Sequence, residues 1–291
     1  MNLSPWIVAA RPRTLSLSMM PVVVGAALAW AAERKIDAFA VAAALVASMF
    51  IQLGTNLHND AADSERGGDG PDRIGPPRAT ASGLLEVSAV KCGAAASFAL
   101  AALMGSYLVY VGGWPILVLG CLSILSGWSY TGGPLPIAYT PLGEFFVVMF
   151  FGLVAVGGTY LLCTRHVTSA AIEAGLAVGS LTAAVLLVNN HRDGAADARV
   201  GRRTLPIVVG PRITVAVYAG LMLLPFVLLP LISRTLSHGR VWPAFIALPA
   251  AAWLISAFAR TERGPDLNRL LLRTVQVQFL FSALLSLGLL L

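Results

Sequence analysis

Charged residues are scarce in this sequence. Asp, Glu, Lys and Arg together make up 12% of its 291 residues, whereas hydrophobic residues make up 57%. The mean hydropathy is +0.78. A water-soluble chain of this length cannot bury so much apolar surface. The composition therefore excludes a soluble globular protein and predicts an integral membrane protein.

Cysteine is also rare. Cys92, Cys121 and Cys163 stand alone among apolar residues, without metal-ligand spacing and without the even number that disulfides need. We interpret them as small packing side chains. The net charge of +6 could serve nucleic acid, but most basic residues lie between apolar runs. Membrane topology explains that pattern, so we expect no nucleic-acid partner.

Long apolar runs, in contrast, are abundant. We distinguish nine of them, of about the length that crosses a bilayer, roughly 20 residues. They are too long and continuous for barrel strands, which leaves helices. The runs cover 15–32, 38–58, 87–111, 114–130, 143–163, 168–190, 211–233, 241–259 and 268–290. The sequence predicts an all-α bundle of about nine transmembrane helices, in one domain over 1–291 because no linker divides it.

Basic residues indicate the topology. Arg11 and Arg13 precede a first apolar run that is longer than the core of a cleaved signal peptide, so we expect a retained span. The N-terminus and the loops after spans two, four, six and eight carry most arginines. The other loops hold only Arg34, Lys35, Arg165, Arg234 and Arg240. The positive-inside rule places the first set in the cytoplasm, and we expect a multi-pass protein of a bacterial-type inner membrane.

Two of these cytoplasmic loops begin with acidic clusters. The first reads N-x-x-N-D-x-x-D, and a Gly-rich segment with further aspartates follows it. On a continuing helix, steps of four and three would place Asn56, Asp60 and Asp63 on one face. The second cluster ends span six with a similar arrangement. The clusters comprise Asn56, Asn59, Asp60, Asp63, Asp69 and Asp72, and Asn189, Asn190, Asp193 and Asp197.

Carboxylates so close together near a membrane require a counter-charge. Mg²⁺ prefers oxygen ligands and often binds one or two carboxylates together with substrate phosphates. Arginines beside both clusters would bind the remaining phosphate oxygens. The pattern therefore predicts Mg²⁺-assisted chemistry on a lipid pyrophosphate whose tail lies in the membrane. If the tail is allylic, aromatic faces and asparagine carbonyls could stabilise the resulting carbocation.

Both clusters resemble motifs of a known family. NLHNDAADSERGGD resembles the first aspartate motif of the UbiA superfamily of intramembrane prenyltransferases, and NNHRDGAADARVGRRTL resembles the second. ARPRTL, DRIGPPR and GEFFVVMFFGLVAVGGTY resemble the menaquinone-pathway branch, which prenylates 1,4-dihydroxy-2-naphthoate. The resemblance extends from Arg11 to the final span. Arg66 and Arg202 depart from it, since the branch often has Lys there.

The resemblance implies a central cavity, capped by the two cytoplasmic Asp-rich loops. It implies transfer of a polyprenyl group from its diphosphate to the aromatic acid, with loss of CO₂, to give a demethylmenaquinone. The implied catalytic residues are Asn56, Asp60, Asp63, Asp193 and Asp197. The implied ligands of two Mg²⁺ ions are Asp60, Asp63, Asp69, Asp193 and Asp197. Diphosphate contacts fall to Arg66, Arg78, Arg202, Arg203, Asn59, Asn189 and Asn190, and candidates for the acceptor are Arg13, Arg73, Tyr130, Tyr139 and Tyr160.

Some alternatives stay open at this point. Another aromatic acceptor, such as 4-hydroxybenzoate, is the main one, although the longer spacing from Asp63 to Asp69 favours the naphthoate branch. A cation transporter would place its charges near mid-span and break its helices, whereas these acids lie at span ends. The Asp-Gly-x-x-Ala-Arg core of CDP-alcohol phosphotransferases is absent. His58 and His191 adjoin the clusters without suiting Mg²⁺, and Glu144 is either a helix-capping charge or functional.

Overall fold

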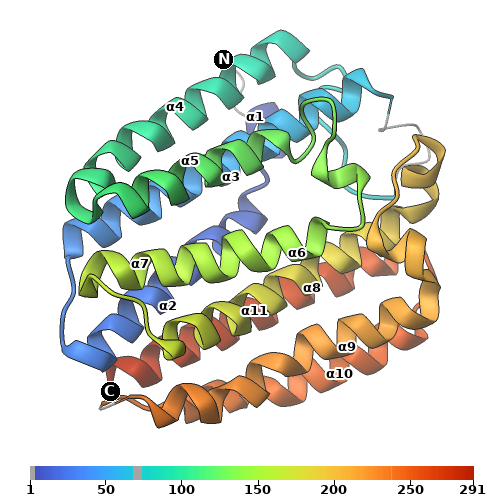
Figure 1. Cartoon of the computed structure of the whole chain (residues 1–291). Coiled ribbons are helices and arrows are strands. Elements are labelled where there is room, and N and C mark those ends of the chain that lie inside the picture. Colours follow the sequence, from blue (N-terminus) through green and yellow to red (C-terminus); the bar gives the residue numbers. More distant parts are fainter. Residues whose placement is uncertain (1–3, 68–73, 237) are drawn as a thin grey trace.

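The computed structural model describes residues 4–67, 74–236 and 238–291, and all regular structure in these ranges is helical (Figure 1). The first half contains α1 (Ser4–Ala10), the 3₁₀ turn η1 (Pro12–Thr14), α2 (Leu15–Glu33), α3 (Ala38–Glu65), α4 (Val87–Gly112), α5 (Trp114–Ser129) and the 3₁₀ turn η2 (Ile137–Tyr139). The second half contains α6 (Gly143–Val147), η3 (Val148–Val154), α7 (Ala155–Thr164), α8 (Ser169–Arg199), α9 (Leu205–Arg234), η4 (Trp242–Ala247), α10 (Leu248–Arg260) and α11 (Asp266–Leu290). The all-α prediction is confirmed.

These helices match the predicted spans. In the described residues, 8 helical stretches are long and apolar enough to cross a membrane, with α6, η3 and α7 forming one stretch and η4 and α10 another. The remaining predicted run, 114–130, corresponds to α5, a shorter apolar helix of 16 residues. The chain is a multi-pass membrane protein. Helices α3 and α8 extend beyond their apolar parts, so Asn56, Asn59, Asp60 and Asp63 of the first cluster and all four residues of the second lie on their last helical turns.

The loops after α3, α5, α8 and α10 gather at one end of the bundle, on the right in Figure 1. We call this the aspartate end, because both acidic clusters lie there. The predicted alternation of loops between two ends is therefore confirmed. At the aspartate end, residues distant in the sequence meet, as the hydrogen bond from Asn268 Nδ2 to the carbonyl oxygen of Ile74 (3.0 Å) illustrates.

Helix α8 lies at the centre of the bundle. In its apolar window 78% of the residues are buried, against 22% in α3 and in α4. Small residues permit this central position, since a Cβ on Gly152 would lie only 2.3 Å from the carbonyl oxygen of Gly175 on α8. Close packing through small residues is a common basis for helix association in membranes. The residue Gly152 belongs to η3, a seven-residue π-helix between α6 and α7.

A cavity of about 1040 Å³ lies beside α8. Helices α2 to α8 and α11 contribute to its lining, whereas α9 and α10 contribute none of the described lining residues. Its aspartate end is polar, with Asn59, Arg78, Asn189, Arg192 and Arg202 in the wall. Further in, apolar residues of α4 and α5 such as Leu108, Ile116 and Leu117 replace them. The fold thus joins a charged mouth to an apolar chamber.

Candidate active site

The first cluster presents Asp63 to the mouth of the cavity. Asp63 lies on the last turns of α3 and is 3% exposed. Its Oδ2 accepts a hydrogen bond from Arg78 Nη2 at 2.9 Å, and its Oδ1 accepts one from Arg202. All three side chains line the cavity. Asp63 is therefore a buried carboxylate whose charge is balanced by two arginines from different loops.

Asp60, one helical turn earlier, has different surroundings. Its Oδ2 accepts from the backbone N–H of Ala79 at 3.1 Å, and its Oδ1 accepts from the N–H of Thr80 at 2.9 Å. The Thr80 hydroxyl also donates to Asp60. With 1% exposure and both oxygens engaged by the loop after α3, Asp60 differs from the free metal ligand that the motif predicts. This geometry fixes the turn that carries Arg78.

Two more residues near the end of α3 attach it to the loop between α5 and α6. Asn59 Oδ1 accepts from the Thr131 hydroxyl at 2.6 Å. Arg66 donates to the backbone carbonyl oxygens of Thr131 and Gly133, and its guanidinium carbon lies 5.4 Å from the ring centroid of Tyr139. Arg66, a predicted diphosphate contact, thus has backbone partners in this structure and is absent from the cavity lining.

The second cluster is organised by Arg192. Its guanidinium donates to both oxygens of Asp193, at 2.8 and 2.7 Å, and to Asn189 Oδ1 at 2.8 Å. It also donates to Asn268 Oδ1 on α11 at 2.8 Å. Because Asn268 in turn donates to the carbonyl oxygen of Ile74, α11 connects the second cluster to the loop of the first.

Arg202 joins the two clusters. Its Nη1 donates to Asp197 Oδ1 at 3.0 Å and its Nη2 donates to Asp63. Its guanidinium carbon lies 5.0 Å from the ring centroid of Tyr139. Burial alone lowers the pKa of Arg202, but the charges of Asp63 and Asp197 outweigh burial and raise that pKa above its ordinary range. Arg202 is therefore a permanent cation between two carboxylates.

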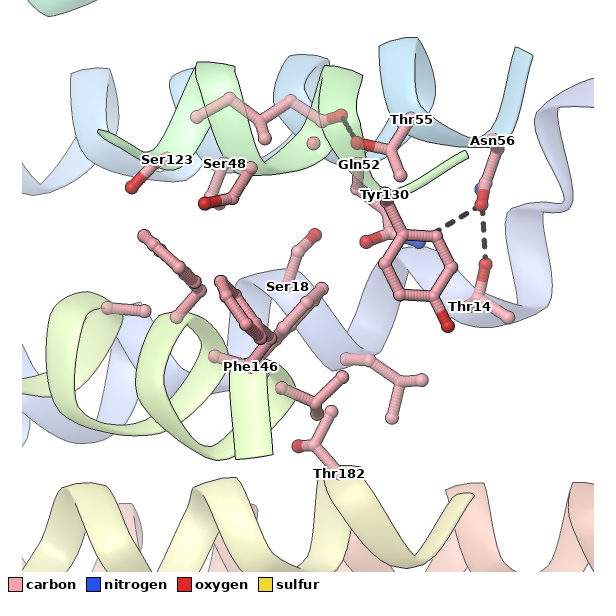
Figure 2. A pocket seen from close by; sticks show the side chains of 18 of the residues that line it. Thr14, Ser18, Ser48, Gln52, Thr55, Asn56, Ser123, Tyr130, Phe146 and Thr182 are labelled. Atoms are coloured by element: carbon pink, nitrogen blue, oxygen red, sulfur yellow. Dashed lines mark hydrogen bonds between the residues drawn. The ribbon is translucent and has the colours of Figure 1, made fainter. Parts of the chain in front are cut away.

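The wall next to this mouth carries neutral polar groups (Figure 2). Asn56 donates to the carbonyl oxygen of Ala10 at 2.9 Å and to the Thr14 hydroxyl at 3.3 Å, and it accepts from Gln52 Nε2 at 3.1 Å. Tyr130, at the end of α5, and Phe146, on α6, point into the cavity from different elements. Aromatic faces and uncharged hydrogen-bonding groups therefore surround the space just inside the charged mouth.

The donor set suits Mg²⁺. Asp63 and Asp197 lie close enough for one guanidinium to bind both, and Asp193 and Asp197 line an adjoining pocket of about 100 Å³. In the described residues, no three Asp, Glu, His or Cys side chains already form a metal-binding group. Arginines engage these carboxylates instead. The site offers only a few carboxylate oxygens. This small number suits Mg²⁺, which takes water molecules and substrate phosphates as its other ligands.

Comparison with known proteins identifies the family. The model of the UbiA prenyltransferase family matches residues 18–284. The chain belongs to the UbiA prenyltransferase family. It is 33% identical to 1,4-dihydroxy-2-naphthoate octaprenyltransferase of Escherichia coli, over 97% of this chain and 94% of that protein. It is 31% identical to the protein of the same name from Bacillus subtilis, over 96% of this chain and 90% of that protein.

Solved structures of UbiA homologues share the fold. A homologue from Archaeoglobus fulgidus bound to DMAPP and Mg²⁺ superposes with a TM-score of 0.71 at 16% identity, and each chain covers 99% of the other. A homologue from Aeropyrum pernix K1 also gives 0.71 at 16% identity, over 93% of this chain and 96% of that one. The bundle described above is thus the UbiA fold.

Within this UbiA fold, most predicted site residues converge at the aspartate end. The main cavity or the adjoining pocket is lined by Asn56, Asn59, Asp63, Arg78, Tyr130, Asn189, Asn190, Asp193, Asp197 and Arg202. Arg203 is exposed, and only its backbone N–H reaches Tyr139, whose carbonyl oxygen it binds at 3.1 Å. Asp69, Asp72 and Arg73 lie outside the described residues, as does the side chain of Arg13.

The structure corrects the prediction that Tyr160 binds the acceptor. As a candidate for binding the acceptor it should lie near the mouth, but it is 1% exposed on α7 towards the opposite end of the UbiA bundle. Its ring centroid lies 5.9 Å from that of His166, and it does not line the cavity. The residue lies on the apolar face of its helix, and its position in the GTY stretch carried no information about its depth in the membrane.

His58 stacks near Trp128, with ring centroids 6.1 Å apart.

Sequence reasoning missed three groups at this UbiA-family site. Asn268 and Thr131 bind residues of the clusters, as described above, and Arg11 lines the cavity. Asn268 and Thr131 are single polar residues without a motif. Arg11 belongs to the ARPRTL stretch, and its backbone is left-handed, with φ of 51°. The sequence analysis named Arg13, two residues later, as a candidate for the acceptor instead.

Proposed function

We propose that this prenyltransferase moves a polyprenyl group from polyprenyl diphosphate to 1,4-dihydroxy-2-naphthoate, with release of diphosphate and CO₂, to give the hydroquinone form of a demethylmenaquinone. The observation that carries the proposal is the Asp63–Arg202–Asp197 arrangement at the mouth of an apolar chamber. It is suited to a substrate with an anionic head and a hydrocarbon tail. The names of the relatives that cover most of the chain support the naphthoate acceptor.

The diphosphate would bind where the two clusters meet. Asp63, Asp193 and Asp197 would hold two Mg²⁺ ions, and when bound Mg²⁺ supplies positive charge that stabilises the departing diphosphate. Arg78 and Arg202 lie within reach of the same space. They would exchange part of their carboxylate contacts for phosphate oxygens, which guanidinium binds well. Two further donors, the amides of Asn59 and Asn189, lie beside them.

The tail would extend from the mouth into the chamber between α2, α3, α4, α5 and α7. Small and apolar side chains such as Ala44, Gly105, Leu108 and Gly120 line this part. Burial of a prenyl chain there would be favourable, at roughly 25 cal/mol per Å² of apolar surface removed from water. The same volume keeps water away from the allylic carbon when diphosphate leaves.

The acceptor would lie beside the first, allylic carbon of the tail, next to the diphosphate. The C–O bond to diphosphate breaks, and a new C–C bond forms between the allylic carbon and the ring carbon that bears the carboxylate. The bond to that carboxylate then breaks, CO₂ leaves, and the ring regains its aromatic character. The faces of Tyr130 and Phe146, which point into the cavity (Figure 2), would stabilise the allylic cation without trapping it.

We further propose that the aspartate end faces the cytoplasm of a bacterial-type inner membrane. The distribution of arginines between the two sets of loops supports this orientation. The lipid substrate would then enter from the membrane and the aromatic acid from the cytoplasm.

The test offers the purified protein a polyprenyl diphosphate with either 1,4-dihydroxy-2-naphthoate or 4-hydroxybenzoate. We expect prenylation of the naphthoate coupled to CO₂ release, and loss of turnover with EDTA that Mg²⁺ restores. Turnover with 4-hydroxybenzoate alone would replace the proposed acceptor, and full turnover in EDTA would remove the metal from the mechanism.

A further inference from the structure

Two adjacent asparagines on α8 have opposite partners. Asn189 Oδ1 accepts a hydrogen bond from Arg192 Nη2 at 2.8 Å. Asn190 Nδ2 donates to Glu144 Oε1 at 2.9 Å. A guanidinium can only donate and a carboxylate can only accept, so each partner fixes which end of the amide it binds. Asn189 therefore has its NH₂ group available, and Asn190 has its carbonyl oxygen available.

Both asparagines line the cavity, so the difference determines what they offer to a substrate. Each asparagine makes its hydrogen bond with the opposite end of its amide. Within the described part of the chain, neither the NH₂ group of Asn189 nor Oδ1 of Asn190 makes a hydrogen bond. An NH₂ donor suits the oxygens of a diphosphate. A carbonyl oxygen would repel those oxygens but would accept a hydrogen bond from a hydroxyl group.

The orientation of Asn190 is held by a buried pair. Asn190 is 7% exposed and Glu144, near the start of α6, is 5% exposed. Glu144 Oε2 is buried without a hydrogen-bond partner among the described residues. Among those residues, Asn190 is the one side chain that donates a hydrogen bond to the Glu144 carboxylate. Losing that bond would remove this side-chain donor from a buried carboxylate, at a cost of about 1–3 kcal/mol. Rotation of the Asn190 amide by 180° is thus disfavoured.

The surroundings of Asn190 suit a planar ring. The position of a Cβ on Gly143 would lie 3.9 Å from Asn190 Nδ2, 3.9 Å from the Tyr130 hydroxyl and 3.3 Å from Leu186 Cδ2. Gly143 leaves this space free. Tyr130 and Phe146 point into the same cavity from α5 and α6 (Figure 2). A polar acceptor therefore stands in a largely aromatic and aliphatic wall.

We propose that Glu144 orients Asn190 so that its carbonyl oxygen accepts a hydrogen bond from a ring hydroxyl of the aromatic acceptor. Glu144 is then a positioning residue, and Asn190 is an acceptor-binding residue. The inference rests on the proposed function, since it assumes a hydroxylated aromatic substrate. It revises the expectation that Asn190, like Asn189, contacts diphosphate. It also gives Glu144 a functional role instead of helix capping.

The experiment compares two ligands on four full-length proteins in detergent, with farnesyl thiodiphosphate and Mg²⁺ present. The ligands are 1,4-dihydroxy-2-naphthoate and 2-naphthoate, which lacks the hydroxyl groups, and the readout is Kd. The proteins are wild type, Asn190→Leu, Glu144→Leu and Asn189→Leu. We expect wild type to bind the hydroxylated acid about tenfold more tightly, the equivalent of about 1.4 kcal/mol. In Asn190→Leu, which lacks the acceptor oxygen, and Glu144→Leu, which lacks the acceptor that orients Asn190, this ratio should fall to about one or two.

The matched variant Asn189→Leu should keep the ratio and instead weaken binding of farnesyl thiodiphosphate by about tenfold. A merely structural effect would weaken both naphthoates equally and leave the ratio unchanged. An unchanged ratio in whichever of Asn190→Leu and Glu144→Leu folds overturns the proposal. So does a loss of farnesyl thiodiphosphate affinity in Asn190→Leu equal to that in Asn189→Leu.

Failure of the proposed function gives a different result. Wild type would then bind neither naphthoate while using another acid, such as 4-hydroxybenzoate. The pair of 4-hydroxybenzoate and benzoate replaces the naphthoates in that case, and the same ratios across the same variants decide the role of Asn190.

Discussion

The two acidic clusters look alike in the sequence but are connected differently in the structure. The first, at the end of α3, binds mainly to loops: Asp60 to the turn at Ala79 and Thr80, and Asn59 to Thr131. The second, at the end of α8, binds mainly to other helices, through Asn268 on α11 and Glu144 on α6.

The two clusters therefore have different roles, although their sequence motifs look alike. The first cluster shapes the cap over the mouth and, among its described residues, contributes the carboxylate of Asp63 to the cavity. The second cluster stands on the most buried helix of the bundle and fixes the position of the polar groups around the cavity. Arg202 binds a carboxylate of each cluster, Asp63 and Asp197.

The largest effect should come from the carboxylates that Arg202 connects. Asp63→Asn and Asp197→Asn should each lower kcat/KM by roughly 10²–10³-fold, because each removes a charge that would hold Mg²⁺ against the diphosphate in the proposed mechanism. Steady-state kinetics with saturating Mg²⁺ measure this. Asp266→Asn, at an exposed carboxylate on α11, is the control and should retain full activity. Equal activity of Asp63→Asn and wild type would show that the first cluster has no metal role.

Arg202→Lys tests the link between the clusters. A lysine ammonium lacks the planar fork that binds two carboxylates at once, so we expect kcat/KM to fall by about 10–100-fold. The loss should fall mainly on KM for the prenyl diphosphate. Arg212→Lys, at an exposed arginine on α9, should change neither constant. A wild-type KM in Arg202→Lys would mean that the two clusters need no common cation.

Asp60→Asn separates the loop-fixing task from the metal task. The amide would present an NH₂ group to the backbone N–H of Ala79 or Thr80, which costs about 1–3 kcal/mol. We expect Tm in detergent to fall by roughly 2–10 °C and kcat/KM to fall by only about tenfold, through misplacement of Arg78. A loss of activity as large as that of Asp63→Asn, with unchanged Tm, would instead make Asp60 a metal ligand.

The smallest effect should come from Asn268, which connects α11 to both clusters. Asn268→Ala should raise KM for the prenyl diphosphate about threefold, because Arg192 and the loop at Ile74 each lose one of several contacts. Asn268→Asp keeps the acceptor for Arg192 but cannot donate to the Ile74 carbonyl oxygen, so it isolates the loop contact. If Asn268→Asp behaves as wild type, the tie to Ile74 contributes nothing to binding.

Sequence reasoning recovered the fold well because length and hydropathy determine it directly. A run such as 211–233 contains enough apolar residues to cross a bilayer, and α9 covers it. Alternation then places every loop at one end or the other. The run 114–130 also forms a helix, because its apolar residues are continuous, although α5 has only 16 residues.

The site was recovered in part. Motif spacing brought out Asp63, Asp193 and Asp197, because helical periodicity relates residues within one element. It could not separate Asp60 from Asp63, since the partner of Asp60 is a turn about 20 residues later. Tyr160 was misplaced because a single aromatic residue carries no information about the direction in which its helix faces. Asn268 was missed because its partners are 76 and 194 residues away in the chain.

The π-helix η3 gives the cavity a straight wall. From α6 to α7 the lining residues recur every four positions, whereas an α-helix turns by about 100° per residue and would rotate such a stripe by about 40° at each repeat. The wider turn of η3 absorbs one extra residue, and such turns often occur at functional sites. The lining residues that begin at Phe146, beside the groups proposed to bind the ring, therefore face the same side of the helix as those near Leu162, beside the proposed tail site. These residues are Phe146, Val147, Phe150, Phe151, Val154, Ala155, Gly158, Thr159 and Leu162.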